Sequence, residues 1–188
     1  MTITLINRTK KLQLRRPERL AAILAATAES LGIDASGGTM GGEVDIVFVG
    51  KRRIRRLNHA FLGRDSATDV IAFNLDTAGG AVPADEDTPR VIGEIYVCPA
   101  VACDAARRYS TGGEYELALY CAHGLLHLAG LDDDTPEARR IMRERERKIL
   151  CLWQDREALE TLIRMHCSGA DDGAAGAPSQ SATTKGLR

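Results

Sequence analysis

The feature that most constrains this chain is an apolar run over residues 117–131 that carries two histidines, His123 and His127. The run falls short of the roughly 18 apolar residues that indicate a membrane span, so it predicts a helix of a soluble, globular protein. A separation of four residues places both imidazoles on one face of that helix, one turn apart. Two imidazoles buried side by side without a partner would be costly, whereas a shared metal ion would satisfy both.

A carboxylate follows the histidine pair at a suitable distance. Gly130 is expected to end the helix, and Asp133 comes three residues later, which gives the pattern H-x-x-x-H-x-x-G-x-x-D. Because the chain can turn back at the glycine, this carboxylate can reach the same ion. Two neutral imidazoles and one carboxylate leave a fourth tetrahedral position for water, which is typical of catalytic zinc. The sequence therefore predicts one Zn²⁺ per chain, held by His123, His127 and Asp133.

The same spacing occurs in the metzincin metalloproteases, whose pattern is H-E-x-x-H-x-x-G-x-x-H. In that pattern the Glu after the first His is the general base that takes a proton from zinc-bound water. Gly124 occupies this position here. A metallopeptidase is therefore an alternative that lacks its base.

Hydrophobic periodicity, turn residues and helix caps predict a single α+β domain, a mixed β-sheet covered by helices, with the metal site at a helix end in a cleft. The runs at 68–73 and 91–97 are expected to pair in one sheet, and Thr111 with Glu114 forms a capping-box pattern. The expected strands are residues 1–6, 44–49, 68–73 and 91–97, and the expected helices are residues 18–31, 51–61, 100–109, 111–129 and 136 to about 165.

The end of the chain differs in composition from the rest. Residues 169–188 contain Gly, Ala, Ser, Thr and Pro, with Leu187 as the one large apolar residue. Such a segment has too little apolar surface to offset the entropy of ordering it. We expect a domain over residues 1–168 and a disordered tail over 169–188.

Cysteine usage predicts a reducing cytoplasm. The five cysteines are odd in number and include no C-x-x-C pair, which fits neither a secreted disulfide framework nor a zinc ribbon. The apolar pieces within the first 16 residues are too short for the core of a signal peptide. Export is therefore not expected.

A basic segment is hidden by the net charge of −1, which by itself excludes a globally basic nucleic-acid binder. Residues 51–64 contain six Lys and Arg and no acidic residue. A solvated helix face would account for them, but beside a metal site they also form a candidate track for RNA phosphates. Arg52, Arg56 and Arg64 are the candidate substrate-binding residues. In the Arg/Glu-rich stretch at 139–148, pairs four residues apart such as Glu144 with Lys148 indicate instead that ion pairs within the helix stabilise it.

Residues 123–133, His-Gly-Leu-Leu-His-Leu-Ala-Gly-Leu-Asp-Asp, resemble the signature H-G-x-L-H-L-x-G-Y-D-H of the bacterial YbeY family. The differences are Leu131 for Tyr and Asp133 for the last His. The resemblance extends over residues 44–150, through Leu57-Asn58, Thr68-Asp69-Val70 and Gly93-Glu94-Ile95 to Met142.

This resemblance implies a zinc-dependent endoribonuclease that acts on single-stranded RNA, in 16S rRNA 3′-end maturation and ribosome quality control. It also implies a cytoplasmic location, no membrane, and ribosomal proteins as further candidate partners. Leu62 stands where the family usually has an arginine for the scissile phosphate, and Arg64 is a candidate substitute. Asp133 adds a negative charge, which should make zinc-bound water less acidic. No residue is an evident general base. Because Leu62 replaces that arginine, a ribosome-assembly factor with a structural metal remains an alternative.

Overall fold

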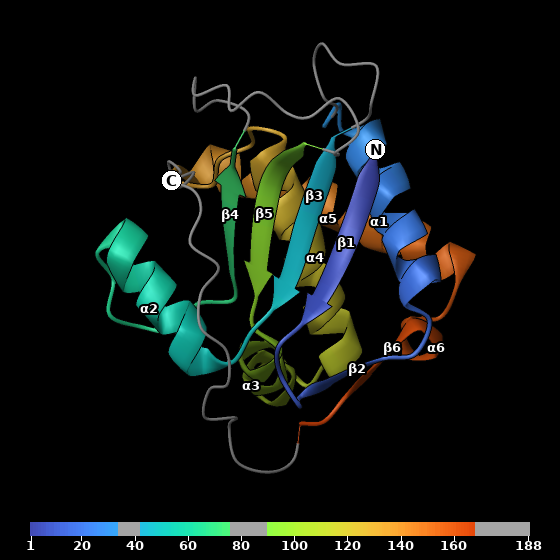
Figure 1. Ribbon diagram of the computed structural model, residues 1–188, viewed down its shortest axis with the longest axis horizontal. Coiled ribbons are helices and arrows are strands. Elements are labelled where there is room, and N and C mark those ends of the chain that lie inside the picture. The colour runs from blue at the N-terminus through green and yellow to red at the C-terminus, as the bar shows by residue number, and fades with distance from the viewer. Residues whose placement is uncertain (34–41, 76–89, 168–188) are drawn as a thin grey trace.

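The computed structural model describes residues 1–33, 42–75 and 90–167 (Figure 1). The disordered tail expected at residues 169–188 lies outside these residues.

The centre of the fold is a four-stranded mixed sheet, as the sequence predicts. Its order is β1 (Thr2–Asn7), β3 (Glu43–Phe48), β5 (Val91–Val97) and β4 (Val70–Asn74). The first three strands are parallel, and β4 runs antiparallel to β5. The expected pairing of the runs at 68–73 and 91–97 is therefore confirmed. A parallel arrangement needs crossover connections, which the helices supply.

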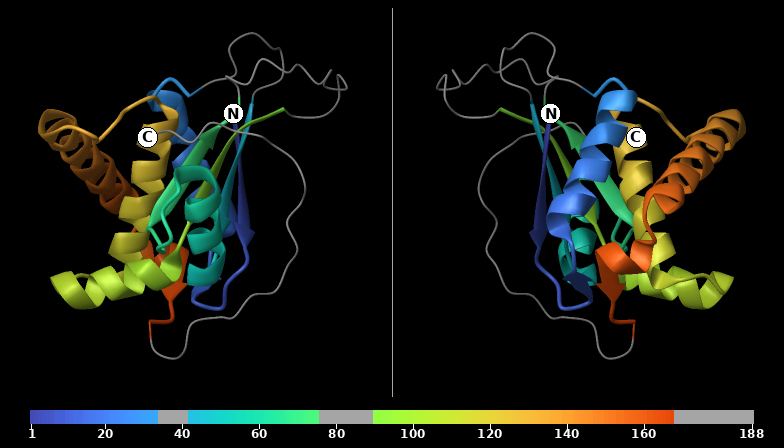
Figure 2. Two further views of the ribbon diagram at one scale, coloured as in Figure 1. Left: turned by 90° about the vertical axis from the view of Figure 1, so that its left-hand side faces the viewer. Right: turned by 90° about the vertical axis from the view of Figure 1, so that its right-hand side faces the viewer.

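Helices cover both faces of the sheet. On one face lie α1 (Pro17–Ser30) and α4 (Gly113–Leu128), and α4 is in turn covered by α5 (Pro136–Arg156), so that α4 lies between the sheet and α5 (Figure 2). On the other face, α2 (Lys51–Leu62) packs beside β4, and Ile54 of α2 contacts a smaller core that includes Ile71 and Phe73. The helix α3 (Pro99–Tyr109) follows β5 directly and packs on α4.

Burial explains why α4 is apolar almost all round. Eleven of its residues are buried, and Leu117, Leu125 and Leu126 are at most 1% exposed. A helix between a sheet and a second helix has little surface left for water. His123 and His127 therefore lie within a closely packed layer.

The end of the fold differs from the prediction. The long helix ends at Arg156 instead of near residue 165, and the chain continues as α6 (Leu159–Leu162) and β6 (Ile163–Met165). Strand β6 pairs antiparallel with β2 (Leu12–Leu14), which the sequence analysis did not identify. Both strands are three residues long, so their local pattern is too short to predict a strand.

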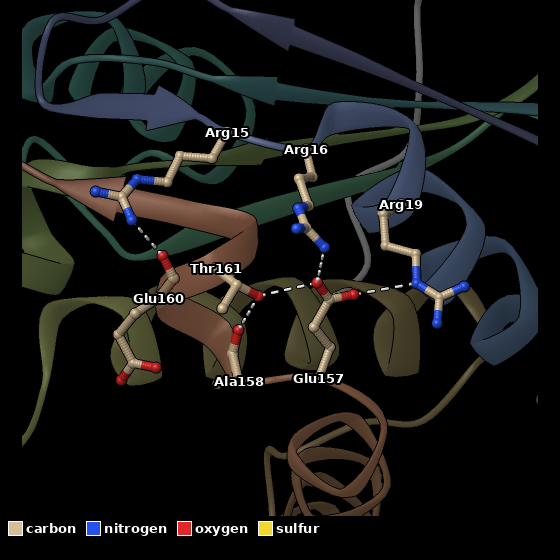
Figure 3. A network of polar contacts seen from close by, with 7 residues as sticks. All are labelled: Arg15, Arg16, Arg19, Glu157, Ala158, Glu160 and Thr161. Carbon is tan, nitrogen blue, oxygen red and sulfur yellow. Dashed lines mark hydrogen bonds and ion pairs between the residues drawn. The ribbon is translucent and has the colours of Figure 1, made fainter.

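A polar network holds this end of the chain to the start of α1 (Figure 3). The carboxylate of Glu157, just after α5, accepts hydrogen bonds from Arg16 at 2.7 Å and Arg19 at 3.1 Å. It also accepts a hydrogen bond from the Thr161 hydroxyl at 3.0 Å. Glu157 and Ala158 have extended backbones, so the helix stops where these tertiary contacts begin.

The predicted capping box is wrong. Gly112 is the N-cap of α4 and makes no side-chain cap. The Thr111 hydroxyl donates to the Glu116 carboxylate at 2.5 Å, and the Glu114 carboxylate accepts the Met165 backbone N–H at 2.8 Å. Tertiary partners thus replace the local cap.

A disulfide joins Cys103 of α3 to Cys167, which follows β6. The number and spacing of the cysteines do not predict this pair, because 64 residues separate the two and only docking of the chain end brings them together. The other cysteines, Cys98, Cys121 and Cys151, form no disulfide. In the part of the chain that the structure describes, no helix is long and apolar enough to cross a membrane.

Candidate metal centre

The histidine pair lies in the last turns of α4, and the turn that follows supplies the third group. Gly130 has a positive φ of 85°, a conformation that glycine adopts without strain, and the helix ends there. The N–H of Gly130 donates to the carbonyl of His127 at 2.9 Å, and that of Leu131 to the carbonyl of Leu126 at 3.0 Å. This reversal returns the chain toward the histidines.

The structure brings all three predicted ligands together. The Nε2 atoms of His123 and His127 are 3.0 Å apart, and the two rings are nearly perpendicular, at 86°. Ligand atoms of His123, His127 and Asp133 all lie within 4.8 Å of one another, so these three groups could hold a metal ion. Two nitrogens bound to one tetrahedral zinc lie about 3.3 Å apart, close to the separation seen here.

In both rings the outer nitrogen, Nδ1, already has a hydrogen-bond partner. Nδ1 of His127 lies 3.0 Å from the carbonyl oxygen of Leu131, which can only accept, so this nitrogen carries the proton. Nδ1 of His123 lies 2.7 Å from Oε1 of Glu146 on α5. With both outer nitrogens donating, each neutral ring presents the lone pair of Nε2 to the other. This arrangement requires a cation, either a proton or a metal ion, between the two rings.

The pKa values of the two histidines move in opposite directions. Burial lowers the pKa of His123, but the hydrogen bond and charge of Glu146 offset it, and the pKa lies above its ordinary value. Burial and the neighbouring His123 lower the pKa of His127 below its ordinary value. An additional proton, which would make one of the two rings cationic, is therefore held preferentially on His123. A metal ion would compete with this proton.

The site opens into a cleft of about 530 Å³, its mouth to solvent included. Asp69, just before β4, contributes a second carboxylate near His123, and its Oδ1 is held by the Val70 N–H at 2.9 Å and the Thr68 hydroxyl at 2.8 Å. From α4 come Leu119, Tyr120 and His123, from the loop Asp133, and from α5 Arg139, Met142, Arg143 and Glu146.

Glu146 is the site residue that the sequence analysis missed. It lies in the Arg/Glu-rich stretch at 139–148, whose charges the sequence explains by ion pairs within the helix. That explanation holds for Glu144, whose carboxylate lies 2.8 Å from Nζ of Lys148. Glu146 instead lies four residues after Met142 and three before Ile149, both buried, and its side chain is 14% exposed. A carboxylate on the apolar face of an amphipathic helix was the signal that could have identified it.

The basic segment lies outside this cleft. Lys51 forms an ion pair with Asp104 at 2.6 Å, and Arg55 forms one with Asp65 at 2.6 Å. Arg52, Arg56 and Arg64 are exposed and are not among the residues that line the cleft.

Gly124 faces the sheet and has no room for a side chain. A Cβ at this position would lie 2.5 Å from Cγ2 of Ile95 and 3.1 Å from Cγ2 of Val70. The glutamate base of a metallopeptidase therefore cannot be accommodated here without moving α4 from the sheet.

The acidic loop around Asp133 is held locally. The Asp132 carboxylate accepts the Asp133 N–H at 2.7 Å, and Thr135 is the N-cap of α5, accepting the Ala138 N–H at 3.1 Å. Asp132, Asp133 and Asp134 also form a second group of carboxylates close enough to share an ion, but two of them are exposed.

Two imidazoles and a carboxylate that converge beside an open cleft, carried by one mixed α/β domain, are typical of metal-dependent hydrolases. A family model described as "Endoribonuclease YbeY" matches residues 4–154 of this sequence. The chain belongs to the YbeY endoribonuclease family.

Two relatives agree with this assignment by sequence. An endoribonuclease YbeY of Elusimicrobium minutum is 40% identical over 111 residues, which are 58% of this chain and 73% of that protein. One from Listeria monocytogenes is 31% identical over 156 residues, 80% of this chain and 94% of that protein. The solution structure of TM1509 from Thermotoga maritima matches with a TM-score of 0.48 at 27% identity, over 83% of this chain and 94% of that one.

Proposed function

We propose that this protein is a zinc-dependent endoribonuclease that cleaves single-stranded RNA, with one Zn²⁺ held by His123, His127 and Asp133. The observation that carries the proposal is the pair of Nε2 atoms 3.0 Å apart, each with its outer nitrogen already donating to an acceptor. Such a pair is ready to bind a cation without any change of tautomer.

When bound, the zinc ion supplies a Lewis acid for a phosphodiester oxygen and an activated water. The protein groups prepare the site for it. Glu146 and the Leu131 carbonyl fix the planes of the two rings, and Asp133 adds a negative charge beside them. The cleft borders His123 and Asp133 and is also lined by Asp69 and Tyr120, so a substrate can reach these two ligands there.

The substrate assignment rests on the family. We propose ribosomal RNA as the target, in 16S rRNA 3′-end maturation and ribosome quality control, in the cytoplasm and with ribosomal proteins as partners. Arg52, Arg56 and Arg64 would serve as an outer track for phosphates, which they would bind without sequence preference.

The test is metal analysis combined with an RNA cleavage assay. Purified protein is expected to contain about one zinc per chain, to cut a single-stranded oligoribonucleotide, and to lose cleavage but not its circular-dichroism spectrum on chelation. Asp133→Ala should lose zinc affinity and cleavage, whereas the neighbouring exposed Asp134→Ala should retain both. Protein that takes up no metal from added zinc would contradict the proposal, and global unfolding on chelation would favour the structural-metal alternative.

A further inference from the structure

We propose that Arg143 of α5 is the residue that binds the RNA phosphate within the cleft, beside the metal ligands. This inference rests on the proposed function, because it assigns the contact that would hold an RNA substrate at the same site. It moves the closest phosphate contact from the basic segment of α2 to a different helix.

The first support is position. Arg139, Arg143 and Glu146 are spaced four and three residues apart, so they share one face of α5. Glu146 on this face bonds to His123, which brings the same face to the histidine pair. Arg139 and Arg143 both line the cleft with His123 and Asp133. Among the described residues, no other lysine or arginine does so.

The second support is charge. Three carboxylates line the cleft or its metal site, namely Asp69, Asp133 and Glu146. A bound divalent ion would leave one net negative charge, which repels an RNA phosphate. The two arginines reverse this balance and leave one net positive charge. The cleft therefore attracts a phosphodiester only with their contribution.

The third support is the difference between the two arginines. Nη1 of Arg139 donates to the backbone carbonyls of Asp133 and Asp134, each at 2.9 Å, so this guanidinium holds the ligand-bearing loop. Arg143 is exposed, and within residues 1–33, 42–75 and 90–167 no carboxylate forms an ion pair with its guanidinium. Its paired donors are thus available for the two oxygens of a phosphate, a geometry that suits arginine.

The test compares Arg143→Gln with Arg145→Gln. Arg145 is exposed, lies about 200° around the helix from Arg143, and is absent from the cleft lining, so both variants lose the same charge from the same helix. The probe is a fluorescein-labelled oligouridylate of twelve residues, titrated with zinc-loaded protein by anisotropy at several salt concentrations. Cleavage of the same oligonucleotide is followed in parallel, and zinc affinity is measured by calorimetry.

Arg143→Gln is expected to weaken RNA binding about tenfold or more, the effect of losing a charged hydrogen bond. It should also lower the slope of log affinity against log salt by about 0.7, and leave zinc affinity unchanged. Arg145→Gln should resemble the wild type, and Arg143→Lys should fall between the wild type and Arg143→Gln.

Three results would overturn the inference. If the wild type cleaves RNA and the two Gln variants bind and cleave it equally, Arg143 has no special role while the proposed function stands. If Arg143→Gln loses zinc affinity, the arginine acts through the metal site. If zinc-loaded wild type neither binds nor cleaves single-stranded RNA, the proposed function fails and this inference fails with it.

Discussion

His123 and His127 differ in the acceptor that holds their outer nitrogen, a carboxylate for one and a backbone carbonyl for the other. The carbonyl is part of the turn and cannot be removed by substitution, whereas Glu146 can. A carboxylate that accepts from a ligating imidazole orients the ring and raises its basicity, and its loss commonly costs 10- to 100-fold in metal affinity.

Glu146→Gln is therefore expected to weaken zinc binding by about 10- to 100-fold, because the amide is a poorer acceptor than the carboxylate. Isothermal titration with zinc measures this effect. Glu144→Gln is the matched control, since Glu144 lies on the same helix and pairs with Lys148 away from the site. Equal zinc affinity in the two variants would mean that Glu146 does not tune the metal ligand.

Asp45 provides a test of pH dependence. It lies on β3 between Thr4 of β1 and Glu94 of β5. Burial and the nearby carboxylates of Glu43 and Glu94 raise its pKa from 3.8 to about 6. The folded state thus binds this proton more tightly than the unfolded state does. Ionisation of Asp45 costs stability progressively as the pH rises from about 4 to about 6, and the full cost remains above pH 6.

Asp45→Asn should consequently raise the free energy of unfolding at pH 8, and the gain should shrink toward pH 4. Urea unfolding at several pH values measures it. Asp104→Asn serves as a control that should instead lower the free energy of unfolding at pH 8. The reason is that the hydrogen bond from Lys51 holds the pKa of Asp104 below its ordinary value. A gain for Asp45→Asn that is the same at pH 4 and pH 8 would contradict this assignment.

At the scale of elements, the close approach of α4 to the sheet decides which chemistry is possible. Gly124 lets the helix pack against Ile95 of β5, and this contact sets the depth at which the histidines lie. The position that carries the base in metalloproteases is thereby used for packing. The same contact explains why one small residue is required in the middle of a buried helix, where glycine is otherwise unfavourable.

Gly124→Ala is expected to destabilise the protein by about 1–3 kcal/mol, since the added Cβ would force α4 and β5 apart. Thermal or urea unfolding gives the value. Gly112→Ser is a suitable control, because a Cβ there would have its nearest neighbour, Cβ of Tyr115, at an ordinary 3.9 Å, and serine is well tolerated at the N-cap position that Gly112 occupies. An unchanged or higher stability of Gly124→Ala would show that α4 and β5 can accommodate a Cβ at this contact.

For the whole molecule, the docking of the chain end closes the fold. Strand β6 pairs with β2 (Figure 1), Glu157 binds the start of α1 (Figure 3), and the Cys103–Cys167 disulfide attaches the segment after β6 to α3. These contacts join the N-terminal and C-terminal parts around α4. If the protein acts in a reducing cytoplasm, as proposed above, the two thiols stay unbonded there and the proposed activity does not require the disulfide.

Reduction of this disulfide should lower stability by at most about 4 kcal/mol, the loop-closure contribution for a cross-link of this span. The double variant Cys103→Ser/Cys167→Ser should unfold at the same urea concentration as reduced wild type, and below oxidised wild type. Replacement of the exposed Cys151 by Ser is the control and should change nothing. Equal midpoints for oxidised and reduced wild type would show that the cross-link adds no stability.

Local patterns in the sequence determine most of the elements and the spacing of His123, His127 and Asp133, because strand alternation, helical periodicity and a helix-ending glycine act over a few residues. They suffice for the mixed sheet and for the convergence of three candidate ligands from one helix and its following turn. The tertiary structure alone decides the partner of His123, since Glu146 lies 23 residues further along the chain. It also decides that Arg143 rather than α2 borders the cleft, that Gly124 faces Ile95, and that α5 ends early to allow β6 to pair. Each of these contacts depends on how α4 packs on the sheet and how α5 and the chain end pack on α4. Packing brings together residues that are far apart in the sequence, and no local pattern predicts such pairs.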